Sequence, residues 1–147
     1  MNLAPDFDEF CGLLIAHRVE FVIVGAYALA FHGAPRATGD LDFFVRPTED
    51  NGRRLIDAIA AFGFPTDSFS AHDIAQGHRV IQIGEEPVQI HIMSDISGVS
   101  WDEAWNGRTP GRCGNHEVAF IGRDQFLANK RASGRPQDLA DVHKLEG

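Results

Sequence analysis

Residues 22–45 read VIVGAYALAFHGAPRATGDLDFFV, and this stretch decides the fold. The β-branched run at 21–24 is too short for a helix and predicts a strand. Gly25 closes that strand, after which residues 26–31 return to helix-forming composition. A loop containing Gly and Pro follows, and residues 41–45 predict the next strand. The expected order is therefore strand, tight turn, helix, loop and strand.

Two carboxylates stand at the entrance of this second strand, Asp40 and Asp42. The period-two alternation of a strand sends both to one face and Leu41 to the other. Carboxylates this close repel each other unless a cation lies between them, so the pair suits a divalent metal. Mg²⁺ is expected because it prefers hard oxygen ligands and completes its shell with water and substrate phosphates. The alternative is that Asp40 caps the turn and Asp42 faces solvent on an edge strand.

The turn at Gly25 and Ala26 supplies free backbone amides at the start of a helix, which favour an anion such as a triphosphate. The plain alternative is a tight turn in which Gly25 only relieves crowding. The order of the features favours the functional interpretation, because an anion site and a cation site lie close together in sequence. Arg36, in the loop between them, is expected to neutralise phosphate charge or to brace the two aspartates.

The remaining sequence predicts one α/β domain over residues 1–147, a usual length for a single domain. Capping patterns and helical periodicity predict helices at 6–17, around 55–62, at 101–105, and two from 123 onward that are divided before Pro136. Apolar runs predict an antiparallel hairpin and a last strand, at 78–83, 88–93 and 118–121. Residues 65–77 contain few apolar side chains and predict a loop with about one helical turn.

Net charge, apolar run length and cysteine spacing exclude several classes of function. The net charge of −8 argues against broad, salt-driven binding to nucleic acid. The most apolar run, residues 21–31, is about half the length that spans a bilayer, and the N-terminus is acidic where a signal peptide is basic. Cys11 and Cys113 show no CxxC spacing and are expected to be reduced structural thiols. We therefore expect a cytoplasmic protein that does not contact a membrane.

The stretch at 22–45 resembles the signature of the DNA polymerase beta superfamily of nucleotidyltransferases, in its small minimal-type members. It is most similar to the branch related to abortive-infection and toxin–antitoxin nucleotidyltransferases, whose pattern runs strand, Gly-Gly or Gly-Ser, helix, His-Gly, Arg, Thr and Asp-x-Asp. The tail NKRASGRPQDLADVHKL at 129–145 also resembles that branch. The resemblance covers most of the chain apart from residues 65–77. It implies a mixed sheet flanked by helices, with further helices at the C-terminus.

The resemblance also implies an activity, the transfer of a nucleotidyl group from ATP or another NTP, bound with Mg²⁺, to an acceptor hydroxyl. Asp40 and Asp42 are then the expected metal ligands and catalytic residues. The expected nucleotide contacts are Gly25, Ala26, Arg36 and Lys130. Lys130 would reach triphosphate oxygens as a point charge. For Arg131 and Lys144, the alternative of a solvated helix face with intrahelical ion pairs is equally open.

Two positions depart from the family pattern. Ala26 stands where the family has Ser or Gly, so a hydroxyl is missing although the backbone amides remain. His91 stands at the position of the third carboxylate. It is expected either to accept the proton of the acceptor hydroxyl or to favour softer ions such as Mn²⁺. Asp95 lies four residues further along, about 13 Å on a strand, which is too far to replace it.

These residues leave more than one function open. The first is metal-dependent nucleotidyl transfer to a tRNA, a protein or a small molecule, in a toxin–antitoxin or phage-defence system with a cognate protein partner. The second is a catalytically impaired nucleotide- or partner-binding module of the same fold. The third is a plain structural domain that binds neither metal nor nucleotide.

Overall fold

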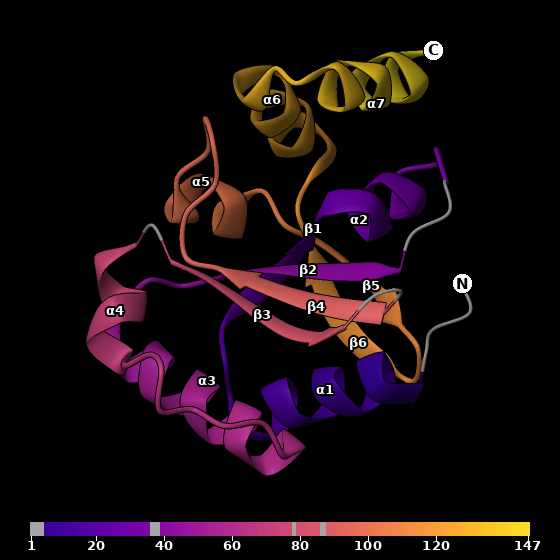
Figure 1. Cartoon of the computed structure of the whole chain (residues 1–147). Helices are drawn as coiled ribbons and strands as arrows, with labels where there is room; N and C mark the ends of the chain where they lie inside the picture. The colour runs from indigo at the N-terminus through magenta and orange to yellow at the C-terminus, as the bar shows by residue number, and fades with distance from the viewer. Residues whose placement is uncertain (1–4, 36–38, 78, 86–87) are drawn as a thin grey trace.

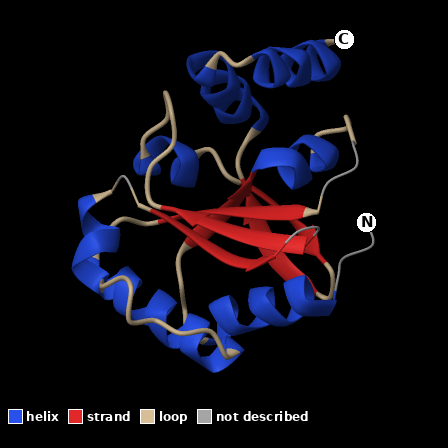
Figure 2. Cartoon of the chain, in the orientation of Figure 1, coloured by secondary structure: helices blue, strands red, loops and turns tan. Residues whose placement is uncertain are grey.

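A mixed six-stranded sheet with helices on both faces organises the chain (Figures 1 and 2). The computed structural model describes residues 5–35, 39–77, 79–85 and 88–147. Arg36, one of the expected nucleotide contacts, lies outside the described residues. The α/β architecture with C-terminal helices that the sequence predicted is confirmed.

The strands are β1 (Phe21–Val24), β2 (Asp40–Val45), β3 (Val80–Glu85), β4 (Val88–Met93), β5 (Thr109–Cys113) and β6 (His116–Phe120). The helices are α1 (Pro5–Ala16), α2 (Gly25–Phe31), α3 (Glu49–Phe62), α4 (Ala71–Gln76), α5 (Trp101–Asn106), α6 (Arg123–Ser133) and α7 (Pro136–Glu146). In Figure 1, α1, α3 and α4 cover one face of the sheet, while α2, α5, α6 and α7 lie on the other.

The strand order β3-β4-β2-β1-β6-β5 places β2 inside the sheet. It pairs antiparallel with β1 and parallel with β4. This position follows from its composition, because Leu41 and residues 43–45 are all buried apolar side chains. The alternative that placed Asp42 on an edge strand is therefore wrong.

Aromatic side chains fix the helices to the sheet. Phe10 of α1 meets Phe43 of β2 edge-on, with ring centroids 5.6 Å apart, and lies 5.2 Å from Phe62 of α3. On the other face, Phe44 of β2 packs edge-on against Trp101 of α5 at 5.2 Å. The interior strand β2 is thus held from both sides, and this fixes the direction of the polar side chains at its entrance.

Several elements differ from the predictions. The first helix begins at Pro5, one residue before its predicted start, so Asp6, the first residue of the predicted capping pattern, lies inside it. The segment at 65–77, expected to be a loop with about one helical turn, contains the six-residue helix α4, which starts with a capping box between Ser70 and Asp73. The strand β5 was not predicted, because Pro110 and the glycine after it weaken the strand pattern.

Other boundaries agree with the sequence. A capping box between Ser100 and Glu103 starts α5, and Pro136 is the first residue of α7. The predicted antiparallel pairing of the hairpin is confirmed, although β3 continues two residues further, to Glu85. Among the described residues, none of the helices is both long and apolar enough to cross a bilayer.

Candidate functional site

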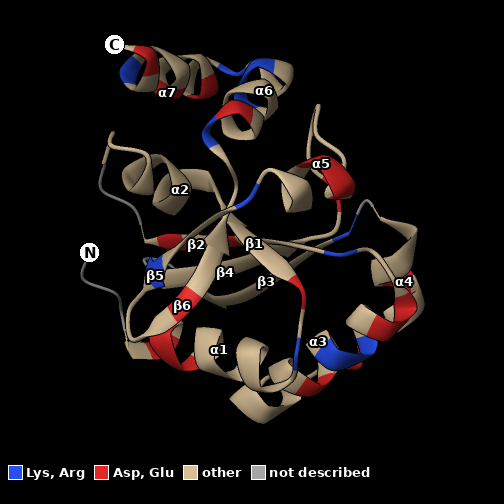
Figure 3. Cartoon of the chain, turned by 180° about the vertical axis from the view of Figure 1, so that it is seen from behind, with Lys and Arg blue, Asp and Glu red and all other residues tan. Residues whose placement is uncertain are grey.

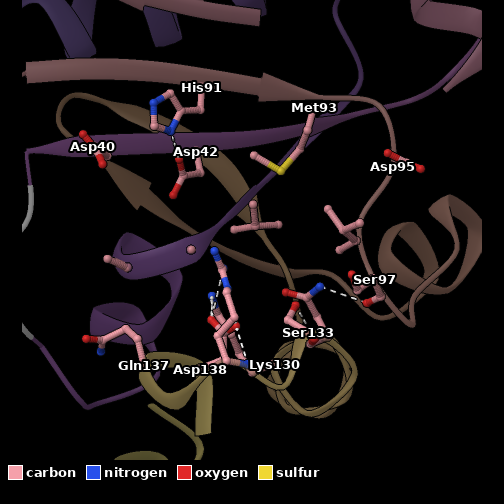
Figure 4. Close-up of a pocket in the computed structure, with 16 residues that line it drawn as sticks. Asp40, Asp42, His91, Met93, Asp95, Ser97, Lys130, Ser133, Gln137 and Asp138 are labelled. Carbon is pink, nitrogen blue, oxygen red and sulfur yellow. Dashed lines mark hydrogen bonds and ion pairs between the residues drawn. The ribbon is translucent and has the colours of Figure 1, made fainter. Parts of the chain in front are cut away.

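A pocket of about 530 Å³ opens between the sheet and the C-terminal helices (Figure 4). Its sheet side carries the acidic group and a histidine, namely Asp40, Asp42 and His91. Its helical side carries a charged cluster, namely Lys130, Arg135 and Asp138. We call these two sets the sheet wall and the helical wall.

The parallel pairing of β2 with β4 builds the sheet wall. Asp42 and His91 are direct partners in the register of the two strands, so residues far apart in sequence meet side by side. The His91 Nδ1 atom lies 2.9 Å from Asp42 Oδ1 (Figure 4). About a fifth of each side chain is exposed, at 24% for His91 and 19% for Asp42. The pair is therefore shielded but open to a ligand in the pocket.

The second ring nitrogen of His91 also has a neighbour. Its Nε2 atom lies 3.1 Å from Gln89 Oε1, two residues earlier on the same strand face. A ring protonated on both nitrogens donates to both oxygens. The neutral ring with its proton on Nδ1 keeps the bond to Asp42 and leaves the Nε2 lone pair able to accept a proton.

Gly25 is required next to Asp42 for two separate reasons. Its φ of +70° lies in the left-handed region that L side chains rarely adopt. A Cβ atom at this position would also overlap the Asp42 Oδ2 atom. The turn and the aspartate thus pack directly against each other, and only glycine allows both the turn and the present position of the carboxylate.

The environment of Asp42 favours its protonated form. Burial raises the pKa of Asp42 above its ordinary value of 3.8, and the nearby Asp40 adds to this rise. His91 and Lys130 act in the opposite direction but do not reverse the net shift. A cation in the pocket would relieve this cost, because it would favour the charged carboxylate.

The helical wall contains a carboxylate whose charge is already balanced. The Asp138 side chain is 2% exposed and accepts hydrogen bonds from Arg135 Nε at 2.8 Å and from Lys130 Nζ at 3.4 Å. Burial raises the pKa of Asp138, but the hydrogen bonds and charges of Arg135 and Lys130 outweigh it, and the net pKa lies below 3.8. Asp138 therefore holds the positively charged side chains of Arg135 and Lys130 at the pocket.

A close backbone approach constrains the start of α6, the helix that carries Lys130. The helix α6 follows Gly122, its N-cap residue. A Cβ atom on Gly122 would overlap the carbonyl oxygen of Gly107, at the end of α5, and the side chain of Gln125. The chain thus enters α6 at a place where there is no room for a side chain.

The structure brings most of the predicted site residues together. The pocket is lined by Gly25, Ala26, Asp40, Asp42, His91 and Lys130. Asp95 lines the same pocket although it lies beyond the end of β4. Gln89, the neighbour of His91, was not predicted, yet it shares strand parity with His91 and this signal could have found it.

The fit of a divalent cation follows from the donor set on β2. Asp40 and Asp42 offer carboxylate oxygens on one side of the pocket, the ligand type that Mg²⁺ prefers. Within residues 5–35, 39–77, 79–85 and 88–147, no group of three or more His, Cys, Asp or Glu side chains is arranged to hold a metal ion. The two carboxylates fit a divalent cation that completes its shell with other oxygen ligands, such as water.

Comparison with solved structures identifies the architecture. Over 100% of this chain and 99% of the other, the structure is similar to the lincosamide antibiotic adenylyltransferase LnuA in its lincomycin-bound form, with a TM-score of 0.63 and 11% identity. The chain has the nucleotidyltransferase fold. A "putative nucleotidyltransferase" from Thermotoga maritima also matches, with a TM-score of 0.58 and 14% identity over 95% of this chain and 86% of that one.

Comparison of the amino-acid sequence with known proteins and families finds no match. No protein-family pattern matches the chain, and no curated protein matches it. At identities of 11% and 14%, the structural likeness concerns the fold, and the activity has to be argued from the residues of the pocket.

Proposed function

We propose that the chain transfers a nucleotidyl group from an NTP to an acceptor hydroxyl at this pocket. The observation that carries the proposal is the meeting of the Asp40, Asp42 and His91 wall with Lys130 across one pocket, on a nucleotidyltransferase fold. Carboxylates that suit a metal ion then face the Lys130 ammonium, which suits phosphate. A metal–nucleotide complex requires both kinds of group.

Each residue has a role in this proposal. Asp40 and Asp42 hold Mg²⁺, or Mn²⁺, together with the triphosphate. When bound, the cation neutralises phosphate charge and polarises the reacting groups. The Lys130 ammonium and the backbone amides at Gly25 and Ala26 steady the phosphates.

The chemical step forms a bond between the acceptor oxygen and the α-phosphorus and breaks the bond from that phosphorus to the oxygen it shares with the β-phosphate. Pyrophosphate leaves. The proton of the acceptor hydroxyl passes to His91 Nε2, while Asp42 holds the ring through Nδ1. This role requires the hydroxyl to take the place beside Nε2 that the Gln89 side chain holds.

The acceptor class and the biological setting extend the proposal. LnuA is an adenylyltransferase of lincosamide antibiotics and is bound to lincomycin, which favours a small molecule among the three acceptor classes that the sequence left open. On the sequence resemblance, we place the activity in a toxin–antitoxin or phage-defence system. Expression of the wild type would then arrest growth, whereas the Asp42→Asn variant would not; equal growth of both strains contradicts this setting.

Incubation with labelled NTPs tests the proposed transfer. The protein is mixed with each α-labelled NTP, Mg²⁺ or Mn²⁺ and a cell extract, and Asp42→Asn serves as the control. Label on an RNA, protein or small-molecule fraction that depends on Asp42 supports transfer. Nucleotide binding without label on any acceptor contradicts it and favours a nucleotide-binding module.

A further inference from the structure

The strand β3 forms one margin of the sheet and pairs only with β4 among the named strands (Figure 1). The direction of its backbone groups follows from two neighbouring hydrogen bonds. The Ser94 N–H donates to the Arg79 carbonyl at 3.3 Å, and the Gln89 N–H donates away from β3, to Gly39, at 3.0 Å. Antiparallel pairs alternate, so Val80, Gln82 and Gly84 direct their N–H and C=O groups toward the free edge.

The two margins of the sheet differ in their protection. The other margin, β5, contains Pro110, which lacks an N–H, and the charged Arg112. From Val80 to Ile83, β3 contains neither proline nor charge, and the Val80 residue is 62% exposed. The φ of Gly84 is +88°, but the ladder with β4 continues past it to Glu85. The β3 edge is thus open to a further strand.

We propose that this edge pairs with β3 of a second copy of the chain, antiparallel, with the two-fold axis at Gln82. In that register the outward-facing groups of Gln82 meet those of the partner's Gln82, and Val80 lies opposite Gly84. Arg79 lies three residues before Gln82 and Glu85 three residues after it, so each Arg79 faces a Glu85 across the interface.

Charge selects this register and this occupant. A shift of one residue would set outward-facing groups against inward-facing ones. A shift of two residues would align the backbone groups again but would separate Arg79 from Glu85. Opposite charges facing each other across strands are favourable and like charges are not. Glu85 is the last residue of β3 and Arg79 directly precedes its first, so the segment whose charges match this edge is the same segment of a second copy.

A cysteine placed at the axis tests the register directly. In a hydrogen-bonded antiparallel pair the Cα atoms lie about 5.5 Å apart, within the range of a disulfide. We expect Gln82→Cys to form a crosslinked dimer under mild copper-catalysed oxidation by air. Val80→Cys, on the same exposed strand face, is the matched control, because its two copies would lie roughly 13 Å apart. The native Cys11 and Cys113 are buried.

Absence of the Gln82→Cys crosslink overturns the proposal, and so does equal crosslinking of both variants. The expected ratio of crosslinked product between the two is at least about tenfold in favour of position 82, since only that pair meets the geometry of a disulfide.

Charge reversal provides a second test in solution. The wild type is expected to sediment at twice the chain mass, whereas Arg79→Glu and Glu85→Arg each place like charges opposite each other and return the mass to that of a monomer. An equimolar mixture of the two variants restores both opposite-charge pairs and is expected to restore the dimer. Thermal unfolding checks that Arg79→Glu folds, since Arg79 also donates to the Ser68 carbonyl.

The control for this test is Glu117→Arg on β6, where the reversed side chain is 87% exposed and far from β3 in the strand order. It is expected to leave the dimer intact. The second-copy interface is overturned if the wild type remains monomeric at every concentration. It is also overturned if the two variants are folded and each is monomeric, but their mixture is monomeric too.

Discussion

Asp42 and Asp138 face the same pocket from opposite walls, yet their surroundings push them in opposite directions (Figure 4). Burial raises the pKa of Asp42, and the neighbouring His91 and Lys130 do not reverse the change. Burial acts on Asp138 too, but Arg135 and Lys130 outweigh it, so the net pKa of Asp138 is lowered. Two aspartates in one pocket thus have pKa values shifted in opposite directions.

The opposite pKa shifts indicate different roles: Asp42 is suited to bind a ligand, and Asp138 supports the pocket. The charge of Asp138 is balanced inside the protein, because the positively charged side chains of Lys130 and Arg135 donate hydrogen bonds to it. The charge of Asp42 is costly until a ligand brings a cation. In Figure 3, Lys and Arg occur together with Asp and Glu on α3, α6 and α7, whereas α1 and α5 carry acidic residues only.

The largest effect is expected from Asp42→Asn, which removes the charge that the ligand's cation would meet. Transfer should fall about 10²–10³-fold, the usual cost of removing one preorganised electrostatic group. The free energy of unfolding at neutral pH should not fall, because the variant removes a carboxylate whose raised pKa disfavours its charged form in the folded state. Label transfer and chemical denaturation measure the two quantities; a large loss of stability contradicts the assignment.

Lys130→Gln is expected to weaken NTP affinity by about 10–100-fold, the range of a lost charged hydrogen bond. Its matched control is the next residue, Arg131→Gln. The Arg131 side chain is 51% exposed and pairs with Glu146 at the surface, whereas the Lys130 side chain is 12% exposed at the pocket. Calorimetry with each variant measures the affinity, and equal losses would show that position 130 has no special role.

Asp138→Asn should lower the free energy of unfolding by about 1–3 kcal/mol at neutral pH, because Arg135 and Lys130 lose their charged acceptor. The net pKa of Asp138 is lowered in the folded state, so its contribution to stability is present above pH 3.8 and is lost as the pH falls through the folded value. The gap between wild type and variant should therefore close below about pH 4 in denaturant titrations. A gap that persists in acid contradicts this account.

Gly25→Ala is expected to cost about 1–2 kcal/mol of stability through its positive φ. Its control is Gly33→Ala, which also has a positive φ, of +109°, but whose Cβ would meet nothing within 4 Å. Only Gly25→Ala should also weaken nucleotide binding, because its Cβ displaces the Asp42 carboxylate. If both variants bind nucleotide as the wild type does, the contact between the turn and Asp42 has no functional role.

The sheet wall was more predictable than the helical wall. Strand parity places Asp40 and Asp42 on one side from sequence alone, and a resemblance marks His91. The pairing of Lys130 with Asp138 crosses the turn between two helices, and no local period reports it. The hydrogen bond of His91 to Asp42 depends on strand register, which the sequence of neither strand specifies alone.

Weak local patterns explain why α4 was expected only as about one turn and why β5 was missed. The short helix α4 has Ile74 as its single buried side chain, too little for a helical period. Strand β5 is stabilised by its pairing with β6 rather than by its own composition, which includes Pro110.

The contact of Gly122 with Gly107 joins two helices at residues that do not line the pocket. It joins the end of α5 to the start of α6, the helix that carries Lys130, and a side chain at position 122 would meet the Gly107 carbonyl oxygen. A survey of lining residues alone would overlook it. The start of the helix that carries Lys130 is therefore constrained by main-chain packing at a glycine, and not by a side chain that would touch a ligand.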